Sequence, residues 1–120
     1  MQSIRSDTRL QALQGLPELA NLSEGQIHGL LRYFDETTVE PGTVVAVEGR
    51  PLGQYVVVLE GSLQERDEAG CRTVEAGESS GWCAMSEHGP SPSTVIATSR
   101  TRLMVMGRAQ FRAVRALKSA

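Results

Sequence analysis

The apolar positions in the first part of the chain recur at helical spacing. Within residues 8–19, four leucines are spaced so that one helical face can hold them, and Gly15 and Pro17 are expected to break this helix into pieces. A capping-box pattern begins at Ser23, and the apolar stripe after it predicts a second helix over about residues 23–34. We therefore expect the chain to begin with two helices.

From residue 37 the pattern changes to short segments rich in Val, Thr and Leu, separated by turns that contain glycine. Short segments at this rhythm are typical of an antiparallel sandwich or roll. A parallel sheet would need crossover helices between the strands, and the intervening segments are too short for them. The predicted strands are 37–39, 44–47, 55–59, 63–65, 72–74, 94–98 and 103–106.

After Met106 the helical spacing returns, with three apolar residues on one side and three arginines on another. These residues are Phe111, Val114 and Leu117, and Arg108, Arg112 and Arg115. The predicted fold class is mainly β: an antiparallel double-stranded, jelly-roll-like β-roll with two N-terminal helices and a C-terminal helix. We expect one domain over residues 1–120, with a helical lead-in at 1–36, the roll at 37–106 and the terminal helix at 107–120.

The composition fits a folded domain, because 40% of the 120 residues are apolar and the formal charge is only −2. No apolar run approaches the roughly 20 residues of a membrane span. The N-terminus has no hydrophobic stretch of the secretory kind, which predicts a cytoplasmic protein with no membrane partner. Cys71 and Cys83 are the only cysteines, and we expect both to be reduced thiols.

The turns between Val39 and Phe111 follow a recognisable order. That order resembles the cyclic-nucleotide-binding domain of bacterial catabolite regulators, kinase regulatory subunits and gated channels. The resemblance covers nearly the whole chain and implies a β-roll with a ligand pocket and a regulatory, non-enzymatic role. Its motifs are Glu40-Pro41-Gly42-Thr43, Val47-Glu48-Gly49, Tyr55 to Leu63, Ala76-Gly77-Glu78, Gly81-Trp82-Cys83-Ala84-Met85 and Thr94-Val95-Ile96-Ala97.

In that family the cassette runs F-G-E-L-A and then P-R-(S/T/A)-A-T-V. Its Glu accepts a hydrogen bond from the ribose, its Arg pairs with the cyclic phosphate, and backbone N–H groups at the start of a short helix bind the same anion. The resemblance implies ligand-binding positions at Gly81, Trp82, Cys83, Ala84, Ser91, Ser93 and Thr94.

The cassette of this chain departs from the family at the polar contacts. An ungapped comparison places Ser80 at the Phe position, Trp82 at the ribose-binding Glu and Ser91 at the phosphate-binding Arg. Pro92 stands where the family donates a backbone N–H, which proline lacks. These departures predict that the domain does not bind cAMP or cGMP in the usual way.

Several of these residues allow two interpretations. Trp82 can stack on a planar ligand, but we expect its indole to fill the vacated ribose slot and close the pocket. The hydroxyls around the cassette can hold a neutral or weakly anionic ligand, or simply reflect loop composition. His88 can replace the Arg when protonated, although an exposed loop histidine is the expectation. Cys83 near a helix N-terminus can be a reactive thiol, although we expect a buried apolar one.

The sequence predicts no enzyme, no cofactor and no metal site. A cupin-type centre needs two or three histidines on strands, whereas His28 lies in a predicted helix and His88 in a loop. No catalytic Ser-His-Asp or Cys-His grouping and no Walker or Rossmann phosphate loop is present.

The charges are unevenly distributed. Residues 1–87 hold all fourteen acidic side chains and six basic ones, and the last 33 residues hold six basic and no acidic ones. The basic end includes the terminal helix, which the family uses as its output, and is a candidate docking face. We expect it to contact a separate effector protein or a second copy, because the chain contains no DNA-binding segment.

Two functions remain open from the sequence. The first is a regulatory module that senses a small ligand or a divergent nucleotide and signals through its terminal helix. The second is a non-sensing scaffold for protein interactions that has lost cyclic-nucleotide binding.

Overall fold

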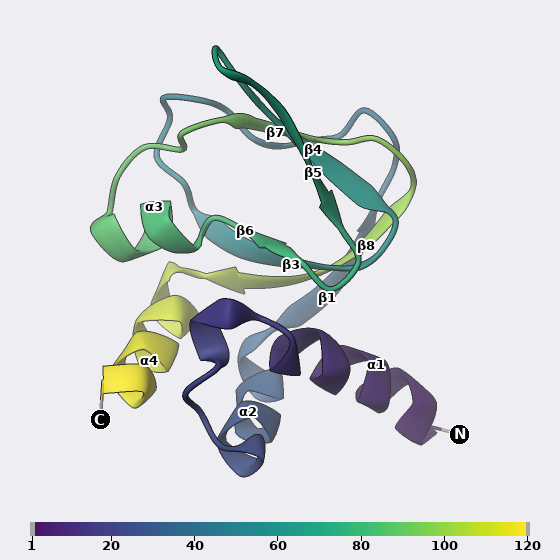
Figure 1. Ribbon diagram of the computed structural model, residues 1–120, viewed down its shortest axis with the longest axis vertical. Coiled ribbons are helices and arrows are strands. Elements are labelled where there is room, and N and C mark those ends of the chain that lie inside the picture. Colours follow the sequence, from purple (N-terminus) through teal and green to yellow (C-terminus); the bar gives the residue numbers. More distant parts are fainter. Residues whose placement is uncertain (1, 120) are drawn as a thin grey trace.

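The computed structural model describes the backbone of residues 2–119 and the side chains of residues 8–116. Figure 1 shows a β-roll with a layer of helices packed on one side of it. The helices are α1 (Gln2–Gln14), η1 (Pro17–Leu19), α2 (Glu24–Leu30), η2 (Leu31–Tyr33), α3 (Trp82–Glu87) and α4 (Arg108–Ser119). The strands are β1 (Asp35–Val39), β2 (Val44–Ala46), β3 (Gln54–Glu60), β4 (Ser62–Asp67), β5 (Gly70–Glu75), β6 (Ser79–Ser80), β7 (Thr94–Ala97) and β8 (Thr101–Gly107).

Two four-stranded sheets form the roll. Their strand orders are β1-β8-β3-β6 and β2-β7-β4-β5, and every pairing is antiparallel. The predicted fold class, a mainly antiparallel β-roll with two leading helices and a terminal helix, is confirmed.

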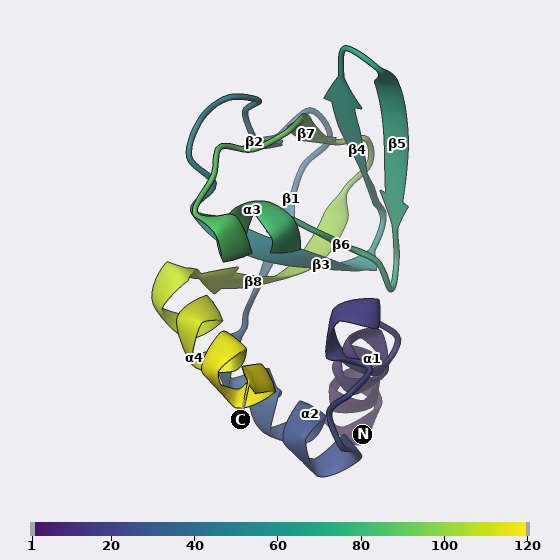
Figure 2. The same cartoon turned by 60° about the vertical axis from the view of Figure 1, so that its left-hand side comes forward.

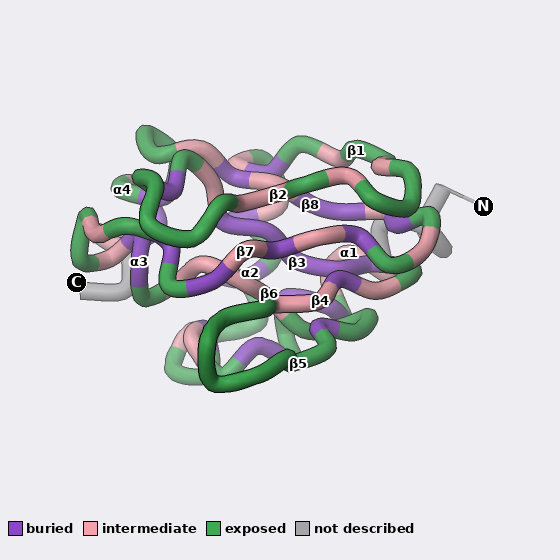
Figure 3. Tube along the Cα trace, turned by 90° about the horizontal axis from the view of Figure 1, so that it is seen from above, coloured by how far each residue is buried: buried purple, intermediate pink, exposed green. Residues whose placement is uncertain are grey.

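Strand β3 is buried on both faces, as the purple trace at the centre of Figure 3 shows. Because successive side chains of a strand point to opposite faces, Val56 and Val58 enter the roll interior while Tyr55, Val57 and Leu59 face the helices. The interior cluster is completed by Leu63, Val74, Val95, Ala97 and Leu103. The second cluster joins β3 and β8 to α1, α2, α3 and α4.

Both predicted N-terminal helices are present. Helix α1 ends at Gln14, and a short 3-10 turn begins at Pro17, so the expected break is confirmed. Helix α1 begins at Gln2, earlier than the predicted stripe. Both bonds of the capping box are present, from Gln26 N–H to Ser23 Oγ at 3.1 Å and from Ser23 N–H to Gln26 Oε1 at 2.8 Å. The predicted second helix continues after α2 as a 3-10 turn.

All seven predicted strands are present, and one strand was missed. Strand β6 consists of Ser79 and Ser80 alone, which pair with Val57 and Val56 of β3. Strand β1 begins at Asp35, two residues before the expected start of the roll. In the terminal helix, Phe111 and Val114 are buried together as expected, whereas the side chain of Leu117 lies outside the described residues.

Within the part of the chain that the structure describes, no helix combines the length and apolar character needed to cross a bilayer.

Candidate ligand pocket

The cassette is built from β6, α3 and the loop that leads to β7, and Figure 2 shows α3 lying beside β6 and above α4. Gly81 joins β6 to α3 with a φ of 107°. A Cβ at this position would lie 2.8 Å from Leu52 Cδ2 and 3.3 Å from the Gln54 carbonyl oxygen. Only glycine accommodates both the positive φ and this close approach.

A pocket of about 240 Å³ lies between the cassette and the roll, and we call it the roll pocket. Six of the seven predicted ligand positions line it: Gly81, Trp82, Cys83, Ala84, Ser91 and Ser93. The seventh, Thr94, does not line it, and its Oγ1 accepts a hydrogen bond from the Glu48 N–H at 3.1 Å. The remaining lining residues are Glu18, Ala46, Leu52, Glu65, Arg72, Ser79, Ser80, Pro92 and Val95.

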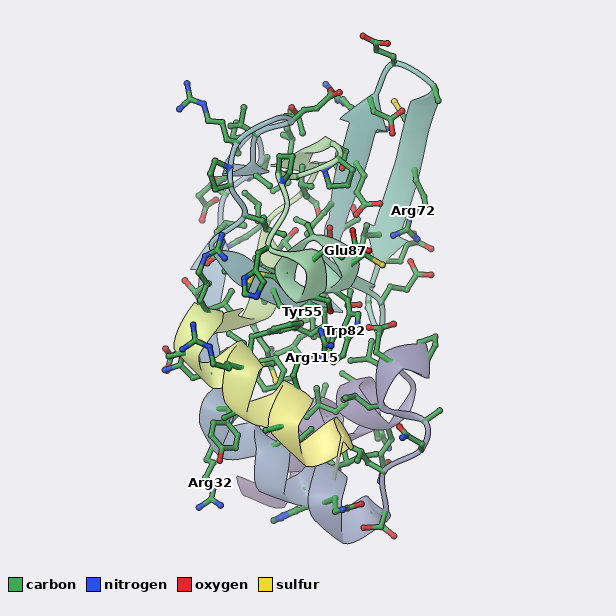
Figure 4. All side chains as sticks on the ribbon, turned by 90° about the vertical axis from the view of Figure 1, so that its left-hand side faces the viewer. Arg32, Tyr55, Arg72, Trp82, Glu87 and Arg115 are labelled. Carbon is green, nitrogen blue, oxygen red and sulfur yellow. The ribbon has the colours of Figure 1, made fainter. Side chains whose placement is uncertain are left out.

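The Trp82 ring packs toward the helical layer. Its centroid lies 5.3 Å from that of Tyr55 and 4.8 Å from that of Phe111, and both contacts are edge-on. Figure 4 shows Trp82 directly beside Tyr55. The indole therefore does not close the roll pocket, contrary to the expectation from the sequence, because the aromatic cluster between β3 and α4 provides it with an apolar contact surface.

Cys83 is exposed, so the expectation of a buried thiol was wrong. The buried positions of α3 are Ala84 and Met85, which turn toward the core, and Cys83 on the same turn is left at the pocket wall. Cys71 lies in β5, as expected, and is also exposed.

An ion pair that the sequence analysis missed lies in the wall of the roll pocket. Arg72 Nε lies 2.8 Å from Glu65 Oε1, and the Ser80 hydroxyl donates to Glu65 Oε2 at 2.5 Å. Arg72 of β5 and Glu65 of β4 are directly opposite in the hairpin, so they share one face of the sheet. The hairpin is centred between Glu68 and Ala69, one residue before the turn expected at Ala69-Gly70, so the predicted turn did not set this pairing.

Ser91, at the phosphate-binding Arg position, already has hydrogen-bond partners within the protein. Ser91 is only 4% exposed, and its hydroxyl donates to the Ser93 carbonyl oxygen at 2.7 Å. Its backbone N–H donates to the Arg50 carbonyl at 2.8 Å, and its carbonyl accepts from the Gly49 N–H at 2.9 Å. Ser91 is therefore held by hydrogen bonds to its own loop and to the segment between β2 and β3, at the point where the family places its cation.

Glu18 brings a second carboxylate to the roll pocket. Its Oε2 accepts hydrogen bonds from the Tyr55 hydroxyl at 2.7 Å and from the Ser79 hydroxyl at 2.9 Å. Burial, and secondarily the neighbouring Glu18, raises the pKa of Tyr55 well above its ordinary value, so this phenol remains a hydrogen-bond donor. The acidic and basic side chains that line the pocket are thus two carboxylates and one guanidinium, and the guanidinium is already paired.

The structure is thus a β-roll with a short cassette helix beside a pocket and a terminal helix next to the cassette helix. The family model for the cyclic nucleotide-binding domain matches residues 36–117, which is more than half of the chain. The protein belongs to this family, whose domains are regulatory modules and typically not catalytic. A search among curated proteins found no match.

Solved structures share the fold at low identity. The regulatory domain of Toxoplasma gondii PKA, co-crystallised with cAMP, aligns with a TM-score of 0.81 at 22% identity over 91% of this chain and 44% of that one. The N-terminal domain of a transcriptional regulator from Streptomyces coelicolor A3(2) aligns with 0.79 at 22% identity over 91% and 80%. A cyclic nucleotide-binding-like protein from Brucella abortus aligns with 0.75 at 16% identity over 89% and 97%.

The present chain thus spans less than half of the Toxoplasma PKA chain, and it spans 40% of the chain of cAMP-bound PfPKA-R. At these identities the structural similarity shows that the fold is shared.

Proposed function

We propose that this protein is a regulatory module whose roll pocket senses a small ligand other than classical cAMP or cGMP. The observation that carries this proposal is the charge of the pocket wall. Glu18 and Glu65 contribute two negative charges, and Arg72, the one cation among the lining residues, is paired with Glu65 at 2.8 Å. A cyclic phosphate in this pocket would meet a net negative wall and no free guanidinium.

The expected loss of affinity is large. Relative to the family cassette, the chain lacks the carboxylate for the ribose, the guanidinium for the phosphate and the N–H at Pro92. Charge-assisted hydrogen bonds contribute roughly 1.5–3 kcal/mol each, so losing two of them and a neutral one weakens binding by about a thousandfold or more.

The route for a signal is the contact between Trp82 and Phe111. Trp82 begins α3 and lines the roll pocket, whereas Phe111 lies in α4, and their ring centroids are 4.8 Å apart. A ligand that displaces the start of α3 would also displace this aromatic contact. In this proposal α4 reports to a separate effector protein or to a second copy of the chain.

Titration calorimetry of the full chain with cAMP, cGMP and adenosine tests the proposal. Adenosine carries no phosphate, so we expect it to bind at least as well as cAMP, the reverse of the order that a phosphate-binding cassette gives. A low-micromolar dissociation constant for cAMP or cGMP would overturn the proposal.

One observation favours the second candidate, a non-sensing scaffold. The Glu65 carboxylate already binds Arg72 Nε with one oxygen and the Ser80 hydroxyl with the other, without a ligand. If Trp82 fluorescence and thermal stability respond neither to the cyclic nucleotides nor to adenosine, the scaffold becomes the better description.

A further inference from the structure

A second pocket, of about 190 Å³, lies between α3 and α4, and we call it the α3–α4 pocket. It shares no lining residue with the roll pocket. Three arginines of α4 and His88 surround it, and Met85 and Phe111 form its apolar floor. Figure 2 shows α3 lying above the beginning of α4, on the same side of the roll.

The charge of this pocket is opposite to that of the roll pocket. Its ionisable lining residues are Arg108, Arg112, Arg115 and His88, and none is acidic. Arg108 and Arg112 are both exposed, and neither forms an ion pair with another described side chain. Glu87, which Figure 4 labels on α3, does not line the pocket. Several guanidinium groups around one small volume favour an anion with more than one oxygen.

Ser86 supplies an independent observation in the same wall. Its Oγ is buried and has no hydrogen-bond partner among the residues that the structure describes. A buried hydroxyl without a partner is unfavourable, and most such groups are satisfied by protein, water or ligand. An oxyanion held by the arginines would offer this hydroxyl an acceptor.

His88 is held at this pocket by an unusual backbone conformation. It has φ 55° and ψ 30°, and it is the one residue other than glycine with a positive φ in the described chain. Its N–H donates to the Ala84 carbonyl and ends α3. Non-glycine residues adopt this conformation at an energetic cost, and such outliers concentrate at functional sites.

We propose that the α3–α4 pocket is a binding site for a small organic phosphate, with the phosphate at the arginines and an apolar group on Met85 and Phe111. A ligand there would contact both α3 and α4 and hold the terminal helix against the cassette. The two pockets share no lining residue, so either proposal can fail alone.

Phenyl phosphate is the probe that matches these features, with inorganic phosphate and phenol as its two halves. In a two-dimensional NMR titration of the full chain, we expect phenyl phosphate to bind about tenfold or more tightly than either half. The backbone signals that shift are those of Met85 to His88 and of the first turns of α4. Benzoate is the carboxylate control, and it is expected to bind more weakly than phenyl phosphate because it carries only one charge.

Charge-removing variants separate a site from a general attraction to a basic helix. Arg108→Gln and Arg112→Gln each remove one lining guanidinium, and each is expected to weaken phenyl phosphate binding about tenfold. Arg100→Gln removes the same charge from a side chain that is 74% exposed and outside the pocket, and it should leave the affinity unchanged. Ser86→Ala should weaken binding without lowering the melting temperature.

The proposal is overturned if phenyl phosphate produces no shifts at millimolar concentration. It is also overturned if Arg100→Gln weakens binding as much as Arg112→Gln, since the attraction would then be non-specific. All substituted arginines are exposed, so circular dichroism is expected to show folded protein for each variant.

Discussion

The Glu65 carboxylate sets the electrostatic character of the roll pocket, because it holds Arg72 with one oxygen and Ser80 with the other. Its side chain is 20% exposed and that of Arg72 is 58% exposed, so the pair contributes little to stability. Its effect is on recognition, since it neutralises the one cation that lines the roll pocket.

The first prediction is that Glu65→Gln increases the affinity for cAMP. The substitution removes a negative charge and leaves Arg72 available to the phosphate, and we expect a gain of about tenfold, which corresponds to one added charge-assisted contact. Glu68→Gln in the hairpin turn removes the same charge away from the pocket and is the matched control. Equal affinities of the two variants in an NMR titration would contradict the assignment.

Tyr55 gives the second prediction, which concerns alkaline pH. Its side chain is fully buried and its hydroxyl donates to Glu18. Burial raises its pKa, whereas an unfolded tyrosine ionises near pH 10. Above about pH 10 the unfolded state therefore binds fewer protons than the native state, and the free energy of unfolding falls by up to about 1.4 kcal/mol per pH unit.

Urea denaturation near pH 8 and near pH 11 measures this effect. Tyr55→Phe is expected to be less stable near pH 8 by about 1–2 kcal/mol, through loss of the hydrogen bond to Glu18, and to lose less stability at high pH than the original protein. Tyr33→Phe, at a half-buried ring, is the comparison. If Tyr33→Phe reduces the loss of stability at alkaline pH and Tyr55→Phe does not, the assignment of that loss to Tyr55 is wrong.

The third prediction uses two glycines with nearly the same positive φ, which is +89° at Gly61 and +91° at Gly42. A Cβ on Gly61 would lie 2.6 Å from the Arg100 carbonyl oxygen, and a Cβ on Gly42 would meet nothing within 4 Å. Gly42→Ala should cost about 1–2 kcal/mol for the left-handed conformation alone. Gly61→Ala should cost about 2 kcal/mol more through overpacking, and denaturant melts with equal losses would contradict this.

At the scale of elements, the sequence predicted the helices and strands whose apolar positions recur with a clear period. The leucine stripe, the capping box at Ser23 and the Gly-marked turns each reflect local chemistry, so no tertiary information was needed. Strand β6 was missed because two serines carry no apolar alternation. It forms because Ser79 and Ser80 can pair with β3.

The candidate site was predictable only in part, because side-chain direction depends on tertiary packing. Six of the seven cassette positions line the roll pocket and Thr94 does not, while ligand binding by these positions stays a prediction. The direction of Trp82 depended on Phe111, which arrives from a helix at the other end of the chain. The exposure of Cys83 depended on which face of α3 the core covers. The pairing of Arg72 with Glu65 depended on the hairpin register.

Considered as a whole molecule, the uneven charges of the sequence partly cancel in space. Arg102 lies within ion-pair distance of Glu36 and Glu60, and Arg100 pairs with Glu40. The first two bases of the basic end are thus neutralised on the roll. The other described bases of the basic end are Arg108, Arg112 and Arg115 of α4, and all three line the α3–α4 pocket.

The two apolar clusters share strand β3, and this gives the last prediction. Because Val56 and Val58 belong to one cluster and Val57 to the other, neither the roll nor the helical layer can lose its core alone. We expect urea unfolding monitored by Trp82 fluorescence and by far-ultraviolet circular dichroism to coincide, as in a two-state transition.

A substitution inside the roll tests this cooperativity, because Trp82 reports from the other side of the sheet. Leu63 is fully buried in the interior cluster, and Leu63→Ala should lower the free energy of unfolding by about 2–5 kcal/mol for both probes. Leu13→Ala in the helical cluster should shift both probes together by a similar amount. If Leu63→Ala moves the circular dichroism transition and leaves the Trp82 transition in place, the two layers unfold independently and the shared strand does not couple them.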